Sequence, residues 1–519
     1  MSERVQKSIL NAKVNILFYL LSLFLAFFSR KIFLDCLGAE FIGLNGTLGN
    51  ILGYLNLAEL GIGSCISFFL FKPLQSDNRE KISELLTVFA YLYRSIGRII
   101  LIAGMVVSLT FPWVFNNTNL GLGIVYFSFY SILGSSLIGY FINYRQIILA
   151  ADQKKYVVTA YMQTANLMKV ALQIFLAYTY KNLYLWVSVE FLFGLIGCIL
   201  LNWRINKIYP WLKTDKNRGK ELLKKYPDIL KNTKQIFIHR IKDFLLGKSD
   251  ELFIFIFVSL KMVAYYGNYT IIVSKFGLLF SSVLDSINAG IGNLVAEGNH
   301  HNMMKVFWET TTIRHFVAGF LCFSIFHFIE PFISLWLGPE YILDRSILIL
   351  LVICIYINSS RGIVDMYNHA HGLYGDVWAA WTELCINLTV TLVAGYFWGI
   401  AGILLGKVTS MGLIILFWKP YYLFHCGLHL PYTHYWRGAS RNYLVSLISF
   451  IAAHIILKRI PIDGTYNYIS CVLFCIAGLA IYLLINLTLI FMFCKGAKDS
   501  LNRIRNKKKR YNHSKFYTT

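Results

Sequence analysis

Apolar residues recur in about fourteen stretches long enough to cross a bilayer, whose core about 30 Å thick needs roughly 20 residues of helix. The connections between them run to about 25 residues at most, below the size at which a chain forms its own core. The pattern predicts an all-α integral membrane protein of about fourteen transmembrane helices, with no catalytic domain, so we expect a transporter and not an enzyme. The stretches begin near Val14, Leu44, Leu85, Gly121, Val157, Leu183, Ile236, Ala264, Thr310, Ile347, Val377, Gly399, Leu444 and Tyr468.

Composition and charge placement agree with this pattern. Of 519 residues, 57% are hydrophobic and 14% are charged, well below the charged share of a soluble domain. With the N-terminus taken as cytoplasmic, roughly 31 of the Lys and Arg residues fall on the inner side and about 7 on the outer side. The largest clusters lie at 204–231 and 495–515. This asymmetry predicts cytoplasmic termini, and we attribute the clusters to topology and contact with anionic lipids, not to nucleic acid.

Several sequence patterns resemble metal or phosphate sites but lack residues that such sites require. The ten cysteines form no C-x-x-C pair, so no zinc site or disulfide framework is indicated. The run from Gly402 to Lys407 has too few residues between its glycines for a phosphate-binding loop, and Val408 follows the lysine. His425, His429 and His434 are spaced like metal ligands, but no acidic residue accompanies them. We expect no metal and no bound cofactor. A proton gradient, a Na⁺ gradient and the membrane potential are all candidate energy sources.

Two short internal matches indicate a duplication. Gly61-Ile62-Gly63 in the second span recurs as Gly290-Ile291-Gly292 in the eighth, and Asn166-Leu167 in the fifth recurs as Asn387-Leu388 in the eleventh. Six spans per half would give both halves the same orientation, and transporters built this way bind substrate at the repeat interface. The expected divisions are an N-lobe (1–208), a basic linker (209–233), a C-lobe (234–420), an added pair of spans (421–494) and a basic tail (495–519).

Ionisable residues inside spans are costly and therefore mark candidate functional positions. The seventh span is the richest, and its residues His239, Arg240, Asp243, Asp250 and Glu251 share an arc of about 120° on a helix. This face is expected to point at the other half or at water. The residues expected to line a substrate cavity are Arg30, Arg240, Lys248, Asp250, Lys275 and Asp285.

The first span has a stripe of uncharged polar residues. Asn11, Asn15, Ser22 and Ser29 lie within about 40° of one another on a helix, and Arg30 follows close to the stripe. Small polar residues are common where membrane helices pack, so the stripe indicates either a helix contact or a cavity lining. We favour the cavity lining because the equivalent span of the second half is the charged one.

Other charges within the spans extend the picture. Lys169 and Glu190 lie in the fifth and sixth spans, and Arg361 and Asp365 in the tenth are spaced for an internal salt bridge. Cations slightly outnumber anions across these spans. A cavity of this character suits an anionic substrate group such as a phosphate.

The layout resembles the MOP superfamily, with twelve core spans in two halves and an extra pair. The stretches L-G-A-E-F-I-G-L-N-G and L-N-L-A-E-L-G-I-G-S resemble the second span of Wzx-type polysaccharide exporters, and Y-F-W-G-I-A-G-I-L-L-G resembles their eleventh-to-twelfth connection. The resemblance implies two lobes around a cationic cavity, in which Arg30 would take part. It implies flipping of undecaprenyl-pyrophosphate-linked oligosaccharide units across the bacterial inner membrane, for O-antigen, capsule or exopolysaccharide.

The implied partners are the lipid-linked glycan, membrane lipids, a polysaccharide polymerase and a chain-length regulator, with the chain itself a monomer. Two alternatives stay open. A MATE-type cation-coupled drug exporter would need a carboxylate in the N-half, and the first span has none before Asp35. The other is a lipid II flippase, a function related to polysaccharide flipping within the same superfamily. A glycan polymerase or ligase is disfavoured because no large outward loop is present.

Overall fold

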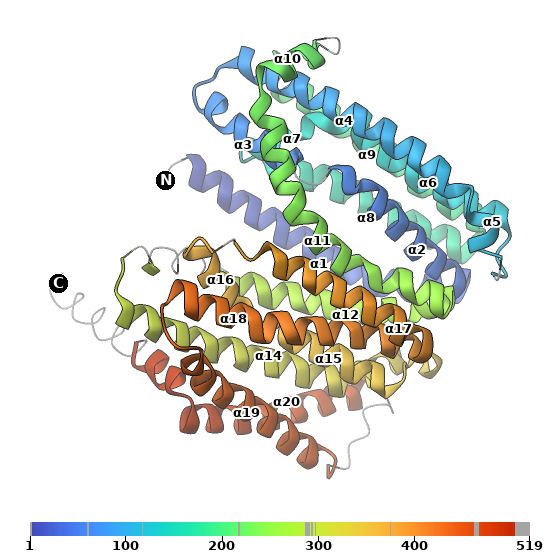
Figure 1. Ribbon diagram of the computed structural model, residues 1–519. Helices are drawn as coiled ribbons and strands as arrows, with labels where there is room; N and C mark the ends of the chain where they lie inside the picture. The colour runs from blue at the N-terminus through green and yellow to red at the C-terminus, as the bar shows by residue number, and fades with distance from the viewer. Residues whose placement is uncertain are drawn as a thin grey trace, which may run out of the picture. The chain divides into compact units, whose positions relative to one another are not determined.

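The computed structural model describes residues 3–59, 62–116, 118–215, 218–285, 291, 294–295, 297–373, 375–460 and 467–503. Every regular element in these ranges is a helix, which confirms the predicted all-α membrane fold (Figure 1). The chain divides into two compact units, Met1–Ala264 and Tyr265–Thr519. Gly61, Gly290 and Gly292 of the repeat motifs, Lys216, and the tail beyond residue 503 lie outside the described residues.

The first unit is a bundle of long helices connected by short turns. Its central contacts are between α1 and α8, between α6 and α9, and between α8 and α9. Its helices are α1 (Glu3–Leu37), α2 (Ala39–Leu55), η1 (Asn56–Glu59), α3 (Ile62–Gln75), α4 (Arg79–Ser108), α5 (Phe111–Val114), α6 (Leu122–Phe141), η2 (Asn143–Arg145), α7 (Gln146–Ala151), α8 (Lys155–Tyr180), α9 (Leu183–Ile208), α10 (Gly219–Lys225) and α11 (Pro227–Phe257).

The second unit is built around α14, which packs against α15, α19 and α20. Helix α12 (Leu260–Asp285) begins in the first unit and continues into the second. The remaining helices are α14 (His300–Trp336), η3 (Pro339–Tyr341), α15 (Arg345–Ser360), α16 (Gly362–Ala370), α17 (Val377–Ser410), the π-helical η4 (Met411–Trp418), α18 (Lys419–Tyr422), the π-helical η5 (Leu423–Gly427), α19 (Tyr432–Leu457) and α20 (Tyr468–Phe493).

These helices account for the predicted spans. Among the described residues, nine helical stretches are long and apolar enough to cross a membrane, and one of them runs over residues 377–427. Gly399 interrupts that stretch with a φ of 53° and a ψ of −128°, a conformation that favours glycine, so it holds two spans in a hairpin. The other predicted spans correspond to the two shorter helices α2 and α3 taken together, and to α8, α11 and α12.

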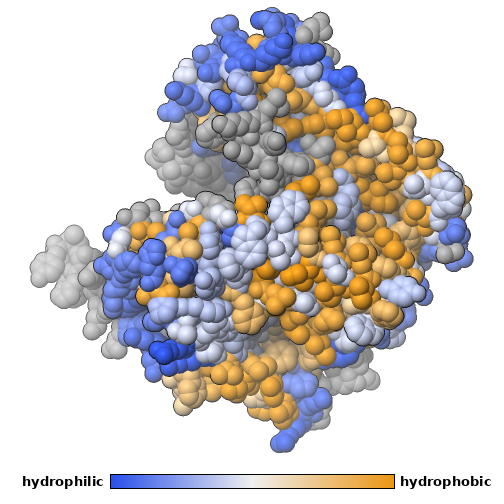
Figure 2. All heavy atoms as spheres, in the orientation of Figure 1, coloured by the Kyte–Doolittle hydropathy of each residue, from blue (hydrophilic) through white to orange (hydrophobic). Residues whose placement is uncertain are grey.

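Large apolar side chains cover the outside of the molecule. Phe24, Trp113 and Tyr396 are each 75% exposed, and Leu484 is 70% exposed. Figure 2 shows broad hydrophobic areas over the helices, with hydrophilic residues gathered around α10. Soluble monomers rarely expose apolar patches of this extent, so the surface is that of a multi-pass membrane protein.

The basic connection of the first unit is docked and not a free linker. Helix α10 lies against α4, where a Cβ added at Gly219 would come 2.5 Å from the Tyr91 side chain. Lys225 Nζ pairs with Glu84 at 2.9 Å, and the Tyr226 hydroxyl donates to the same carboxylate at 2.5 Å. Partial burial and this hydrogen bond raise the pKa of Tyr226 to about 12, so its hydroxyl keeps its proton at neutral pH.

Helix α11 packs with the first unit, against α2 and α3. The sequence repeat assigns the same helix to the second half. The two ways of dividing the chain use different criteria. The repeat follows the order of the spans along the sequence, whereas the compact units follow contacts in the structure. The repeat-based boundaries therefore stay a prediction.

Candidate functional site

Arg30 lies near the C-terminal end of α1, where it contacts the start of α12. Its Nη2 atom donates a hydrogen bond to the Ala264 carbonyl oxygen over 2.9 Å, and both residues belong to the first unit. The neighbouring Ser29 is buried and bonds back to the Ala26 carbonyl within α1. Backbone contact therefore positions the Arg30 guanidinium, one of the cations expected in the substrate cavity.

The polar end of α11 faces α2. Asn50 Nδ2 donates to Glu251 Oε2 at 2.6 Å, and the adjacent Asp250 is only 7% exposed. A glycine also lets α2 approach the start of α12 closely, because a Cβ added at Gly43 would lie 1.9 Å from the Leu260 carbonyl oxygen. Asp250 is thus buried and Glu251 is half-buried beside α2, as expected of charges that cannot face lipid. That they line a water-filled cavity stays a prediction.

Most of the polar stripe on α1 faces α8 and the turn before it. The Asn11 amide donates to the Gln153 carbonyl at 2.8 Å and its oxygen accepts from the Tyr156 backbone N–H at 2.6 Å. Thr159 Oγ1 donates to Asn15 Oδ1 at 3.1 Å, and Ser22 Oγ lies 3.5 Å from Gln163 Oε1. These bonds match the helix-contact alternative for the first three stripe residues. Cavity lining by the stripe stays a prediction.

The remaining predicted cavity residues lie elsewhere. Lys275 is half-buried on α12, in the second unit. The side chains of Arg240, Lys248 and Asp285 lie outside the described part of the structure, although their backbones belong to α11 and α12.

Other charges in the spans form ion pairs, one of which was expected. Arg361 Nε lies 3.3 Å from Asp365 Oδ2, which confirms the predicted salt bridge. Lys169 Nζ pairs with Glu190 Oε1 at 2.7 Å, and Gln173 donates to the other Glu190 oxygen at 3.3 Å. These charges stabilise contacts between neighbouring segments.

Among the charged positions that the sequence analysis missed are one in α14 and one in η1. Arg314 on α14 is 3% exposed, and its Nη2 donates to the Leu284 carbonyl at 3.4 Å, next to Asp285. Glu59 lies in η1, where the second span is broken between α2 and α3. Both are ionisable residues in apolar sequence, the signal applied to the other spans, so the same test would have found them.

Glu59 is held by two tyrosine hydroxyls from neighbouring helices. Tyr93 of α4 donates to its Oε1, and Tyr140 of α6 donates to its Oε2 at 2.6 Å. Tyr140 also lies 3.1 Å from Asn56 Oδ1, which accepts from Ser136 at 3.4 Å. This network gives the first unit a carboxylate at a helix break, the kind of position at which transporters bind coupling ions.

The described residues contain no group of three or more His, Cys, Asp and Glu side chains that could hold a metal ion. Tyr209, which follows α9, is buried, and burial together with its 2.7 Å hydrogen bond to Asp152 raises the pKa of its hydroxyl. This residue therefore anchors the chain after α9 as a neutral donor.

Comparison with known proteins identifies the fold. Neither a protein-family model nor a curated protein matches the sequence. Lipid II flippase MurJ in an inward closed conformation is similar with a TM-score of 0.63 and 16% identity, covering 93% of this chain and 99% of MurJ. An inward-facing multidrug resistance transporter of the MATE family, from the MOP superfamily, is similar with a TM-score of 0.55 and 14% identity, covering 80% and 97%.

The class of protein that this fold defines is a multi-pass, all-helical membrane protein built like MurJ and the MATE transporters. A MATE transporter in a bent conformation is also similar, with a TM-score of 0.50 and 13% identity over 81% of this chain and 97% of that one. At these identities the likeness concerns the arrangement of helices and not the substrate.

Proposed function

We propose that this protein is a flippase that moves undecaprenyl-pyrophosphate-linked oligosaccharide units across the bacterial inner membrane. The observation that carries the proposal is the extent of the likeness to MurJ, which takes in 93% of the chain. The twelve expected core spans end at residue 420, and the MATE transporters cover 80% and 81% of the chain, the share that a twelve-span protein would cover. A flippase is therefore a better match to the full length, which includes α19 and α20.

The chemistry of the headgroup supports an anion carrier. A pyrophosphate that crosses hydrocarbon must exchange its hydration for fixed positive charge, and guanidinium groups bind phosphate in forked geometry. Arg30 is the described cation best suited to this role in the first unit, because its backbone contact with α12 holds it where two helices meet. Arg240, Lys248 and Lys275 are proposed to extend the cationic surface, and Asp250 and Asp285 to contribute the anions of the cavity.

The related alternative is a lipid II flippase. Its substrate would have the same pyrophosphate group as the proposed substrate and a different glycan. A second candidate from another class is cation-coupled drug efflux, which Glu59 favours as an embedded carboxylate in the first unit. Its two hydroxyl partners make it equally suited to a structural role. For the polysaccharide flippase, we propose that a proton or Na⁺ gradient or the membrane potential resets the transporter and that both termini lie in the cytoplasm. We propose further that the chain is a monomer, with a polymerase and a chain-length regulator as downstream partners.

The test is the effect of Arg30 on export. We expect Arg30→Ala to abolish surface glycan while the protein still reaches the membrane, and Arg30→Lys to restore it only in part because the fork is lost. The measurement is accumulation of the lipid-linked unit on the cytoplasmic leaflet of a deletion strain complemented with each variant. Lys31→Ala, one residue along the same helix, is the matched control and should complement fully.

A different result would replace the proposal. Deletion that leaves surface glycan intact but increases sensitivity to cationic drugs would establish efflux. Accumulation of the peptidoglycan precursor in place of a polysaccharide unit would establish the lipid II reading.

A further inference from the structure

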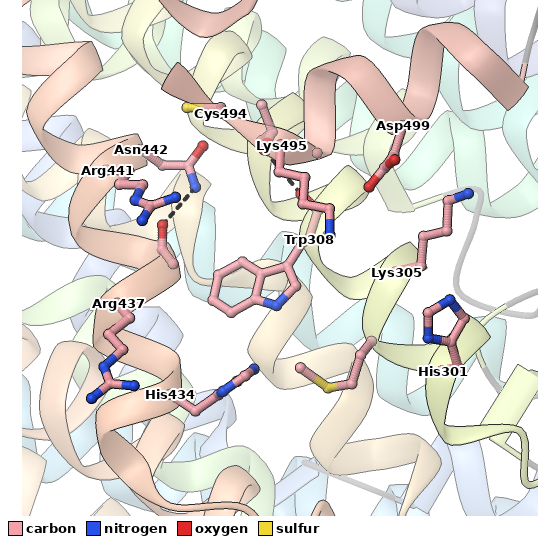
Figure 3. Close-up of a pocket in the computed structure, with 14 residues that line it drawn as sticks. His301, Lys305, Trp308, His434, Arg437, Arg441, Asn442, Cys494, Lys495 and Asp499 are labelled. Carbon is pink, nitrogen blue, oxygen red and sulfur yellow. Dashed lines mark hydrogen bonds between the residues drawn. The ribbon is translucent and has the colours of Figure 1, made fainter. Parts of the chain in front are cut away.

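A basic pocket lies where α14, α19 and the helical segment 495–503 meet (Figure 3). Its volume is about 580 Å³, within the range of small-molecule sites. Among its lining residues are Lys305, Trp308, His434, Arg437, Arg441 and Lys495. All of them belong to the second unit, so the pocket is complete without any contribution from the first.

Trp308 forms the centre of the pocket because two glycines let the neighbouring segments approach it. A Cβ added at Gly438 of α19 would lie 2.2 Å from the indole ring. One added at Gly496 would lie 2.3 Å from the Trp308 carbonyl oxygen. These close approaches fix three segments around one aromatic wall, and Figure 3 shows the indole between the side chains of α19 and those near residue 495.

The charge of the pocket is strongly positive. Four Lys and Arg residues line it, and Asp499 is the acidic residue among the lining side chains. The nearby Glu309 does not offset them, since its Oε2 is paired with Arg503 Nη1 at 3.0 Å. Arg437 and Arg441 are one turn apart on α19, and within the described residues neither guanidinium forms an ion pair or side-chain hydrogen bond.

Helix ends add to this potential. His301 and Lys305 lie in the first two turns of the 37-residue α14, and His434 and Arg437 in the first two turns of the 26-residue α19. The N-terminus of a helix carries a partial positive charge and unpaired N–H groups, which favour anions. Side chains from the first turns of both helices line the same cavity.

We propose that this pocket binds an anion bearing one or two phosphate groups, either the headgroup of an anionic phospholipid or a soluble phosphate ester. Guanidinium groups grip phosphate through paired N–H donors. Basic pockets between transmembrane helices bind anionic headgroups, and tryptophan is enriched at membrane–water interfaces. None of the lining residues is among those proposed for the substrate cavity, so this proposal does not rest on the proposed function.

The experiment uses purified full-length protein in detergent, with lipids counted by native mass spectrometry. Phosphatidylglycerol should be retained in preference to phosphatidylcholine, and Arg437→Gln/Arg441→Gln should weaken phosphatidylglycerol binding about tenfold or more, since charged hydrogen bonds are worth at least that much. Arg459→Gln, at the opposite end of α19, is the matched control and should bind as the unaltered protein does. Both arginines are exposed, so the double variant should elute and melt normally; Arg437→Gln alone provides the comparison if it does not.

A second arm identifies the source of the phosphate. Inorganic pyrophosphate is titrated into lipid-depleted protein and then against bound phosphatidylglycerol. Binding and displacement would assign the pocket to soluble phosphate compounds, whereas retention of the lipid alone would assign it to headgroups. Equal binding of both probes by the unaltered protein and the double variant would overturn the proposal, as would an equal loss in Arg459→Gln.

Discussion

At the scale of residues, Glu59 shows how a carboxylate is retained within an apolar span. The break between α2 and α3 turns its side chain towards Tyr93 and Tyr140, and each of its oxygens accepts a phenolic hydrogen bond. A carboxylate so bonded is far less costly than one in contact with lipid, because its lone pairs are occupied.

Replacing Glu59 should therefore destabilise the first unit. We expect Glu59→Leu to lower the free energy of unfolding by about 2 kcal/mol, since it leaves the buried Tyr93 hydroxyl without this acceptor and the Tyr140 hydroxyl with Asn56 alone. Tyr140→Phe should cost about 1 kcal/mol, in the range of hydrogen bonds between membrane helices. The measurement is unfolding of detergent-solubilised protein in increasing sodium dodecyl sulfate. Additive losses in the Glu59→Leu/Tyr140→Phe double variant would contradict the contact.

The sequence predicted some contacts of individual residues and not others. Helical spacing alone identified the Arg361–Asp365 pair, because both partners lie on one helix. It placed Asn11, Asn15 and Ser22 on one face but could not say which helix faces them, and in the structure that helix is α8. Partners distant along the chain depend on tertiary packing, which periodicity does not contain.

At the scale of elements, the hairpin at Gly399 joins two spans almost without a loop. The two helices then pack closely: a Cβ added at Gly402 would lie 1.9 Å from the Ala394 carbonyl oxygen, and one at Gly406 would lie 2.3 Å from Thr391 Oγ1. Thr391 Oγ1 lies 3.3 Å from the Ile403 carbonyl oxygen across the same interface. The glycines of G-I-L-L-G thus serve helix packing, which agrees with the rejection of this run as a phosphate-binding loop.

Gly402→Ala should consequently force the two helices apart. We expect a loss of about 1–3 kcal/mol, the usual cost of overpacking a close contact. Gly412→Ala is the matched control, since nothing lies within 4 Å of a Cβ added there. The measurement is the unfolding midpoint of each variant. A Gly402→Ala protein as stable as the control would show that the two helices can accommodate a Cβ at this position.

The spans themselves were largely predictable, including the start of the twelfth near Gly399. Apolar length and composition are local properties, and the bilayer imposes one spacing on all of them. The docking of α10 on α4 was not predicted, because it depends on Gly219 fitting against Tyr91, a contact between segments far apart in the sequence.

At the scale of the whole molecule, the charge asymmetry predicts which ends of the helices face the cytoplasm. We expect Lys213→Cys, before α10, to be labelled by impermeant maleimide only in broken cells, and Asn119→Cys, before α6, in intact ones. Cys385 and Cys426 are the exposed native thiols of the described chain, so both are first changed to serine. Labelling of Lys213→Cys from outside would reverse the topology and remove the basis of the repeat.

The central place of α14 has a mechanical consequence. Phe323 stacks on Tyr482 of α20 with ring centroids 4.8 Å apart and meets Phe450 of α19 edge-on at 5.6 Å. On another side, Cys322 Sγ lies 3.5 Å from the Val352 carbonyl oxygen of α15. A helix wedged on so many sides cannot tilt alone. In any motion of the second unit, we therefore expect α19, α20 and the basic pocket to move together with α14.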